Sequence, residues 1–100
     1  MKVFFTPGAE ASLELIGDFI ARDNPARAAT FVAELRIRAL GLATLPHGFP
    51  LVPRYERLGV RRRSWRGYGI LYRVADERIV ILRFLGPGQD HDRLLGLGAD

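Results

Sequence analysis

The chain has 100 residues, of which 48% are hydrophobic, and its formal net charge is +4. This length predicts one domain, residues 1–100, with a core of modest size. The absence of cysteine excludes disulfides and thiolate-bound metals, and no apolar run approaches the roughly 20 residues that span a bilayer. No secretory leader is visible, so we expect a cytoplasmic protein that does not bind membranes.

The first part of the chain predicts a strand followed by a helix. Residues 2–6 are rich in β-branched and aromatic side chains, which favours a strand. Thr6-Pro7 is a typical helix start, with the threonine as N-cap and the proline at the first position. Between residues 9 and 22 apolar residues recur at helical spacing, so the helix is expected to continue from this start to about residue 22. They are Leu13, Ile16 and Ile20, with Leu15 and Phe19 widening the stripe.

A second helix follows after a very short link. Asn24 caps it and Pro25 opens it. We expect this helix to continue to about Leu45, because Pro46 then ends it. Its apolar face consists of Ala28, Phe31, Val32, Leu35, Ala39 and Leu42. So short a link makes the two helices pack as an antiparallel hairpin.

The second half predicts three antiparallel strands. Residues 46–59 form a connector rich in proline and glycine, and residues 60–65 form a strand. A tight turn then leads into a β-hairpin made of residues 68–74 and 78–85. The second arm is apolar on both faces except at Arg83, which predicts an interior strand whose arginine faces a partner or a groove. Helices grouped ahead of an antiparallel meander indicate an α+β fold with the helical hairpin on one sheet face.

Arginines are the main candidate site residues, since they make up all but one of the 15 basic residues. Arg61 and Arg63 share one face of their strand, and Arg73 and Arg83 lie on the next two strands. Together they are candidates for a patch that binds phosphates or an acidic peptide. Tyr72 is expected to be a sheet residue of the core rather than an acid. No catalytic constellation, cofactor-binding loop or metal-ligand spacing is visible, so we expect no cofactor, no metal and no catalytic residue.

Several short motifs follow one another along the chain: Asp23-Asn24-Pro25-x-x-Ala28, Leu45-Pro46, Gly59-Val60-Arg61, Tyr68-x-Ile70-x-Tyr72-Arg73-Val74, Ile79-x-Ile81-x-Arg83-x-Leu85 and Asp90. This ordered set resembles the RelE/ParE toxin family, closest to ParE, over nearly the whole chain. The resemblance implies a toxin of a type II toxin–antitoxin pair with the order β-α-α-β-β-β and a small, mostly antiparallel sheet. It also implies a ParD-like antitoxin whose flexible tail folds onto the toxin.

The family divides by activity. RelE-type members cut mRNA on the ribosome, whereas ParE-type members poison DNA gyrase. Gly69 and Gln89 stand where the ribonucleases carry basic residues that stabilise a phosphoryl transition state. The resemblance therefore implies a non-enzymatic toxin that inhibits DNA gyrase by protein–protein contact. The alternatives are a RelE-like ribosome-dependent mRNA endonuclease that uses the arginines, with His91 as acid or base, and an inactive toxin-fold binding module.

Partner binding is expected on the helical hairpin and the sheet. Ile37 and Leu40 fall outside the apolar face of the second helix, and leftover apolar surface on so small a protein implies a cover. We expect the antitoxin to supply it with an amphipathic segment whose carboxylates lie near the arginines. The predicted partner-binding residues are Arg61, Arg63, Arg73, Arg83, Phe31, Leu35, Ile37 and Leu40. Direct binding to nucleic acid is not expected other than through the antitoxin complex.

Overall fold

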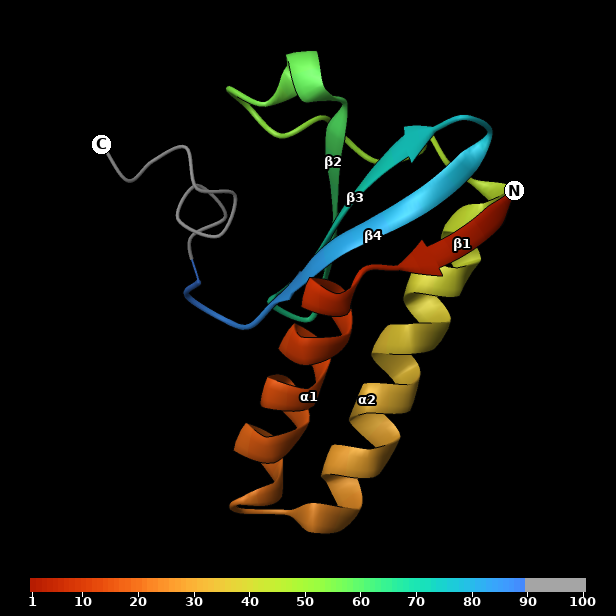
Figure 1. The fold of residues 1–100 in the computed structure, drawn as a ribbon. Coiled ribbons are helices and arrows are strands. Elements are labelled where there is room, and N and C mark those ends of the chain that lie inside the picture. Colours follow the sequence, from red (N-terminus) through yellow and green to blue (C-terminus); the bar gives the residue numbers. More distant parts are fainter. Residues whose placement is uncertain (90–100) are drawn as a thin grey trace.

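The computed structural model describes residues 1–89 and has the predicted order of elements (Figure 1). In chain order they are β1 (Lys2–Phe5), α1 (Pro7–Ala21), α2 (Pro25–Leu40), the 3-10 helices η1 (Gly41–Thr44) and η2 (Glu56–Leu58), β2 (Val60–Trp65), β3 (Tyr68–Ala75) and β4 (Arg78–Leu85). The α+β class and the helical hairpin against a small sheet are confirmed. Asp90 of the motif set lies outside the described residues.

Helix α1 begins at the predicted cap. The Thr6 hydroxyl accepts a hydrogen bond from the backbone N–H of Ala9 at 3.0 Å and donates one to the carbonyl of Ile81 at 2.9 Å. Pro7 lies in the first turn, where its missing N–H costs nothing. The same threonine therefore starts the helix and ties it to β4, so β1 passes into α1 without a loop.

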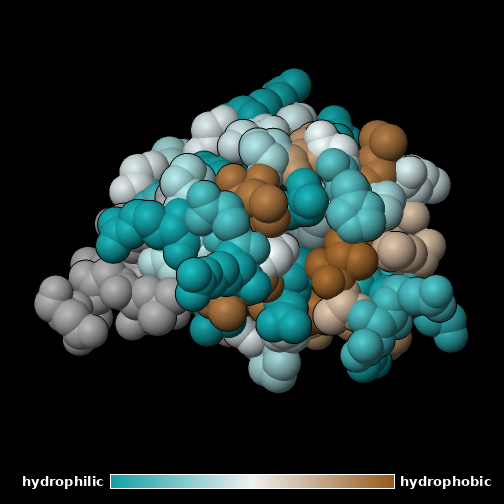
Figure 2. Space-filling model, turned by 90° about the horizontal axis from the view of Figure 1, so that it is seen from above, coloured by the Kyte–Doolittle hydropathy of each residue, from teal (hydrophilic) through white to brown (hydrophobic). Residues whose placement is uncertain are grey.

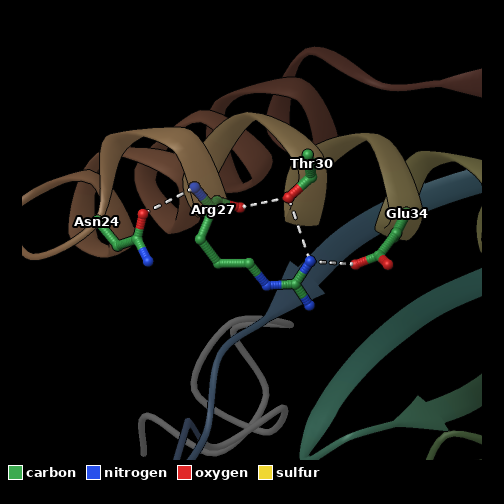
Figure 3. Close-up of polar contacts among 4 residues, drawn as sticks. All are labelled: Asn24, Arg27, Thr30 and Glu34. Carbon is green, nitrogen blue, oxygen red and sulfur yellow. Dashed lines mark hydrogen bonds and ion pairs between the residues drawn. The ribbon is translucent and has the colours of Figure 1, made fainter.

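Helix α2 begins at Asn24, whose side-chain oxygen accepts a hydrogen bond from the backbone N–H of Arg27 at 3.0 Å (Figure 3). Farther along the helix, the Arg27 guanidinium donates to the Thr30 hydroxyl at 3.1 Å and pairs with the Glu34 carboxylate at 3.0 Å. These side chains are partly exposed, so each contact stabilises the helix by only about 0.2–0.5 kcal/mol.

The α-helical part of α2 is shorter than predicted. It ends at Leu40 and η1 follows, whereas the sequence predicts one helix to about Leu45. Gly41 has poor helix propensity and adopts φ −63° and ψ −17°, values typical of a 3-10 turn. Ala39 and Leu42 are both buried, so the apolar face continues through the change of helix type.

The sheet has the strand order β1-β4-β3-β2. β1 runs parallel to β4, and the other two pairs are antiparallel. β4 is therefore an interior strand, as its two apolar faces predict. The hairpin turns are Arg66-Gly67 and Asp76-Glu77, and their four residues have φ values of 52°, 82°, 53° and 60°, the left-handed conformation of a type I′ turn.

The two faces of the sheet bury separate apolar clusters. The helices cover one face, and its core includes Leu13, Ile16, Phe31, Leu35, Ile70, Tyr72, Ile79, Ile81 and Phe84. On the opposite face, the connector between α2 and β2 packs Val52 and Tyr55 against Val60, Leu71 and Leu85. Part of the apolar sheet surface that the sequence assigns to an antitoxin is thus covered by the chain itself.

Candidate partner-binding surfaces

β2 carries Arg61 and Arg63 on the side of the sheet that faces the helices, since both are in register with β3 residues of the helix-facing core. The Arg61 guanidinium donates a hydrogen bond to the Phe49 carbonyl at 2.7 Å. Arg63 donates one to the Arg38 carbonyl at 3.0 Å. The two side chains therefore fasten the connector and the end of α2 to β2, in addition to any contact with a partner.

Aromatic rings hold guanidinium groups in place at this edge of the sheet. The guanidinium carbon of Arg63 lies 4.9 Å from the ring centre of Phe49, and those of Arg38 and Arg66 lie 4.6 and 5.2 Å from that of Trp65. A guanidinium that lies over a ring can still donate hydrogen bonds from its N–H edge to a carboxylate or phosphate. Burial, and then the positive charge of Arg38, lower the pKa of Arg63, so two cations stand close together here.

Tyr72 is a core residue, as predicted. Its side chain is fully buried, and its hydroxyl donates a hydrogen bond to the Pro46 carbonyl at 2.9 Å. Burial raises the pKa of this hydroxyl, and the positive charges of Arg61 and Arg63 oppose that rise. The hydroxyl therefore stays protonated at neutral pH and links β3 to the connector.

Arg73 lies apart from the other predicted arginines. It is exposed on the sheet face opposite the helices, because its neighbours Tyr72 and Val74 point into the helix-facing core. Arg62 reaches the same face, where its guanidinium lies across Gly69; a Cβ at Gly69 would come within 2.8 Å of it. Glycine at position 69 thus makes room for Arg62.

Arg83 lies in a groove between α1 and β4, in agreement with the expectation for a lone arginine on an interior strand. The groove has a volume of about 610 Å³, and Leu15 and Phe19 line its α1 side. The guanidinium rests on the first turn of α1 at Gly8, where a Cβ would overlap it, and donates to the Leu82 carbonyl at 2.9 Å. Among residues 1–89, no carboxylate forms an ion pair with Arg83.

The four predicted apolar partner residues fall into two groups. Phe31 and Leu35 are buried between the helices and the sheet. In this conformation a partner cannot reach them, so we remove both from the candidate surface; they belong to the core. Ile37 and Leu40 are 59% and 48% exposed on α2 and stay candidates.

Leu15 and Phe19 belong to the surface, although the sequence places them in the buried stripe of α1. They are 69% and 66% exposed. β4 and α2 cover the sides of α1 that carry Leu13 and Ile16, and the adjoining side is left open at the groove. The spacing of four residues between Leu15 and Phe19 is the signal that could have identified them as a second apolar strip.

Within residues 1–89, no cluster of three His, Asp or Glu side chains is placed to hold a metal ion. In the same part of the chain, no helix has the length and apolar character needed to cross a membrane. His91, the acid or base of the alternative function, lies outside the described residues. The surfaces that the structure does describe offer arginine groups for anions and apolar side chains for contact.

Known proteins resemble the chain in both sequence and fold. A family model described as the ParE toxin of the type II toxin–antitoxin system parDE matches residues 3–91. The fold is similar to a chain of the chromosomal ParDE system of P. aeruginosa, with a TM-score of 0.75 and 24% identity over 87% of this chain and 96% of that one. It is also similar to a chain of the RelBE2 toxin–antitoxin complex of Mycobacterium tuberculosis, with a TM-score of 0.64 and 27% identity over 85% and 95%. No curated protein sequence matches the chain.

The family match extends over α1, α2 and the three strands that follow, so it includes the groove and the β2 edge. The helical hairpin and the mixed sheet also agree with the fold of the similar solved structures. The chain therefore belongs to the ParE toxin family of type II toxin–antitoxin systems.

Proposed function

We propose that the protein inhibits DNA gyrase by protein–protein contact, without catalysis, and that it acts in the cytoplasm. The observation that carries the non-enzymatic part is the dispersal of its arginines. Arg61 and Arg63 bond backbone carbonyls beside α2, Arg73 is exposed on the opposite sheet face, and Arg83 rests on α1. Phosphoryl-transfer catalysis needs several cationic groups aimed at one phosphate, whereas these four are divided among three surfaces and only Arg61 and Arg63 share one.

Purified toxin, DNA gyrase and relaxed plasmid test this proposal directly. We expect the toxin to inhibit supercoiling and to trap cleaved plasmid, which becomes visible once the proteins are denatured. Addition of the antitoxin should restore supercoiling and abolish the cleaved product. Full supercoiling without cleaved plasmid at micromolar toxin would contradict the proposal.

Ribosome-dependent cleavage of mRNA is a second candidate function. The observation in its favour is the 27% identity with a chain of the RelBE2 complex. Toxin added to translating ribosomes should then produce new 5′ ends within the message, and a His91→Ala variant should produce fewer of them if His91 moves a proton. Intact message together with normal translation would remove this candidate.

We also propose that a ParD-like antitoxin neutralises the toxin by binding in the groove between α1 and β4. The groove combines the exposed Leu15 and Phe19 with an Arg83 guanidinium that has no carboxylate partner among residues 1–89. An amphipathic segment that carries a carboxylate suits this combination. Apolar contact should set most of the affinity, and Arg83 should add a smaller charge-assisted contribution to it besides setting the association rate and the specificity.

We propose the exposed Ile37 and Leu40 as a second antitoxin contact, on α2 and outside the groove. Binding of the antitoxin to Arg83→Ala and Leu40→Ala variants across a range of salt concentrations separates the two contributions. The effect of the arginine change should shrink as salt rises, because salt screens its charge, whereas that of the leucine change should persist. If the leucine change has no effect while the arginine change abolishes binding at every salt concentration, this division of roles is wrong.

A further inference from the structure

Positive charge is concentrated in one stretch of the chain. Residues 54–73 contain seven arginines and one glutamate, a balance of +6, whereas the whole chain carries +4. This stretch contains the edge strand β2 and its flanking turns. Viewed from the end of the molecule where the connector and β2 begin, hydrophilic side chains surround small groups of hydrophobic ones (Figure 2). Such segregation of charge is typical of a surface that binds a polyanion.

Five arginines meet at this strand, and we call them the β2 basic edge: Arg38, Arg61, Arg62, Arg63 and Arg66. Among residues 1–89, none of the five forms an ion pair with a carboxylate, whereas Arg27 and Arg36 pair with Glu34 and Glu10 at 3.0 and 2.9 Å. The charges of the β2 basic edge are therefore not neutralised within the described part of the chain. They are available to an anion from outside.

The guanidinium groups of the β2 basic edge are held in position before a ligand arrives. Arg38, Arg63 and Arg66 lie over aromatic rings, and the Arg62 Nε donates a hydrogen bond to the Ser64 hydroxyl at 3.1 Å. Side chains that are already ordered lose less rotamer entropy on binding. The edge is thus prepared to bind anions at a small entropic cost.

Trp65, the aromatic residue at the centre of this edge, is already in contact with other side chains on its ring. Phe31 stacks on Trp65 with ring centres 5.3 Å apart, and the guanidinium groups of Arg38 and Arg66 lie over the same ring. An unpaired base would need an open aromatic face to stack on. The edge therefore offers charge without a stacking platform, which suits phosphates rather than bases.

The arrangement of the charges favours an extended ligand. Arg61 and Arg63 leave β2 toward the helices and Arg62 leaves it toward the opposite face, so the cations follow the strand rather than close around a point. Repeated charges along a chain match this arrangement better than a single carboxylate does. We propose that the β2 basic edge binds the sugar–phosphate backbone of a nucleic acid without reading its sequence. This goes beyond the sequence-based expectation, which allows contact with nucleic acid only through the antitoxin complex.

The test needs only the full-length toxin and labelled nucleic acids, so its outcome does not depend on whether gyrase is the target. Fluorescence anisotropy follows binding to a duplex DNA and a single-stranded RNA of about 20 nucleotides per strand over roughly 50 to 300 mM salt. We expect the logarithm of the affinity to fall linearly with that of the salt concentration, with a slope of about −3 to −5. Duplex DNA should bind more tightly, because its charge density is higher.

Arg62→Gln and Arg66→Gln are the informative variants, because neither side chain bonds a backbone carbonyl in the described contacts. Each should weaken binding about five- to tenfold near 0.1 M salt and reduce the salt slope by about one. Arg22→Gln removes the same charge at the C-cap of α1, far from β2 at the tip of the helical hairpin (Figure 1). This control should change the affinity for nucleic acid less than twofold, because salt screens a charge so far from the bound ligand.

Three results would overturn the proposal. The first is no binding to either nucleic acid at low salt, which is expected if the arginines only keep the edge strand from pairing with another chain. The second is an equal loss in Arg22→Gln and Arg66→Gln, which would mean that net charge alone attracts the ligand. The third is tighter binding of an acidic peptide of equal length with the same dependence on Arg62 and Arg66. Binding to either nucleic acid with the expected effects of the variants supports the proposal. The nucleic acid that binds more tightly, duplex DNA or single-stranded RNA, then identifies the preferred ligand.

Discussion

The substitution Gly8→Ala separates the stability of the fold from the use of Arg83 in binding. Gly8 lies in the first turn of α1, and an added Cβ would overlap the Arg83 guanidinium. The backbone at Gly8 does not have positive φ, so alanine meets no strain there. The overlap involves the far end of a flexible side chain, which can swing aside. Gly8→Ala should therefore displace Arg83 without disrupting the helix.

The free energy of unfolding should change little in Gly8→Ala. Alanine favours a helix interior over glycine by up to about 1 kcal/mol, and we expect about half of that in the first turn. Loss of the Arg83 hydrogen bond to the Leu82 carbonyl costs about 0.5–1 kcal/mol. The two terms nearly cancel, so urea denaturation should give a value within roughly 0.5 kcal/mol of the native protein. A loss well beyond 1 kcal/mol would show that Arg83 cannot move aside.

The affinity for the antitoxin should fall much more. A displaced guanidinium forfeits a charge-assisted hydrogen bond of about 1.5–3 kcal/mol, which raises Kd roughly 10- to 150-fold. Titration calorimetry with the antitoxin measures this. Gly48→Ala is the control, because its new Cβ would lie 3.4 Å from Leu45 in the connector, outside both the groove and the proposed contact at Ile37 and Leu40, and its Kd should be unchanged. An unchanged Kd in a folded Gly8→Ala variant would refute the role given to Arg83.

Leu35→Ala should lower the free energy of unfolding by about 2–5 kcal/mol, because Leu35 is fully buried, whereas Ile37→Ala should change it by less than about 0.5 kcal/mol; urea denaturation of both variants checks this. Leu40→Ala should weaken antitoxin binding equally at low and high salt in a calorimetric titration. Tyr72→Phe should cost about 1–3 kcal/mol, because the Pro46 carbonyl loses its donor. Burial raises the Tyr72 pKa, so the stability from this group is present below the usual tyrosine pKa of about 10 and is lost as pH rises past it. Urea denaturation between about pH 8 and 11.5 should therefore show that the free energy of unfolding falls less with rising pH in Tyr72→Phe than in the native protein.

The helix starts and the hairpin turns could be predicted from the sequence because their signals are local. Thr6-Pro7 and Asn24-Pro25 start the two helices through hydrogen bonds to residues three positions away. Arg66-Gly67 turns the chain within two residues. Such features depend on a few neighbouring residues, and tertiary packing seldom overrides them. They are enough to define the order of elements and hence the fold class.

The role of individual arginines could not be predicted in the same way, because it depends on contacts distant in sequence. Arg61 bonds a carbonyl 12 residues away and Arg63 one 25 residues away. No pattern within β2 indicates these partners. The same limit applies to Phe31 and Leu35. An apolar helix face predicts which residues are shielded from water, but it does not show whether the chain itself or a partner covers them.

The position of Arg83 depends on the register of β4 rather than on its residue pattern. Strict alternation would place Arg83 on the face of Ile79 and Ile81, which are fully buried beneath the helices. The pairing with β3 instead shifts by one residue at Leu82, so Phe84 turns into the helix-facing core. A guanidinium buried there without a partner would destabilise the fold by several kcal/mol. The bulge lets the strand stay interior while its arginine emerges beside α1, and this explains how an otherwise apolar strand supplies the cation of the groove.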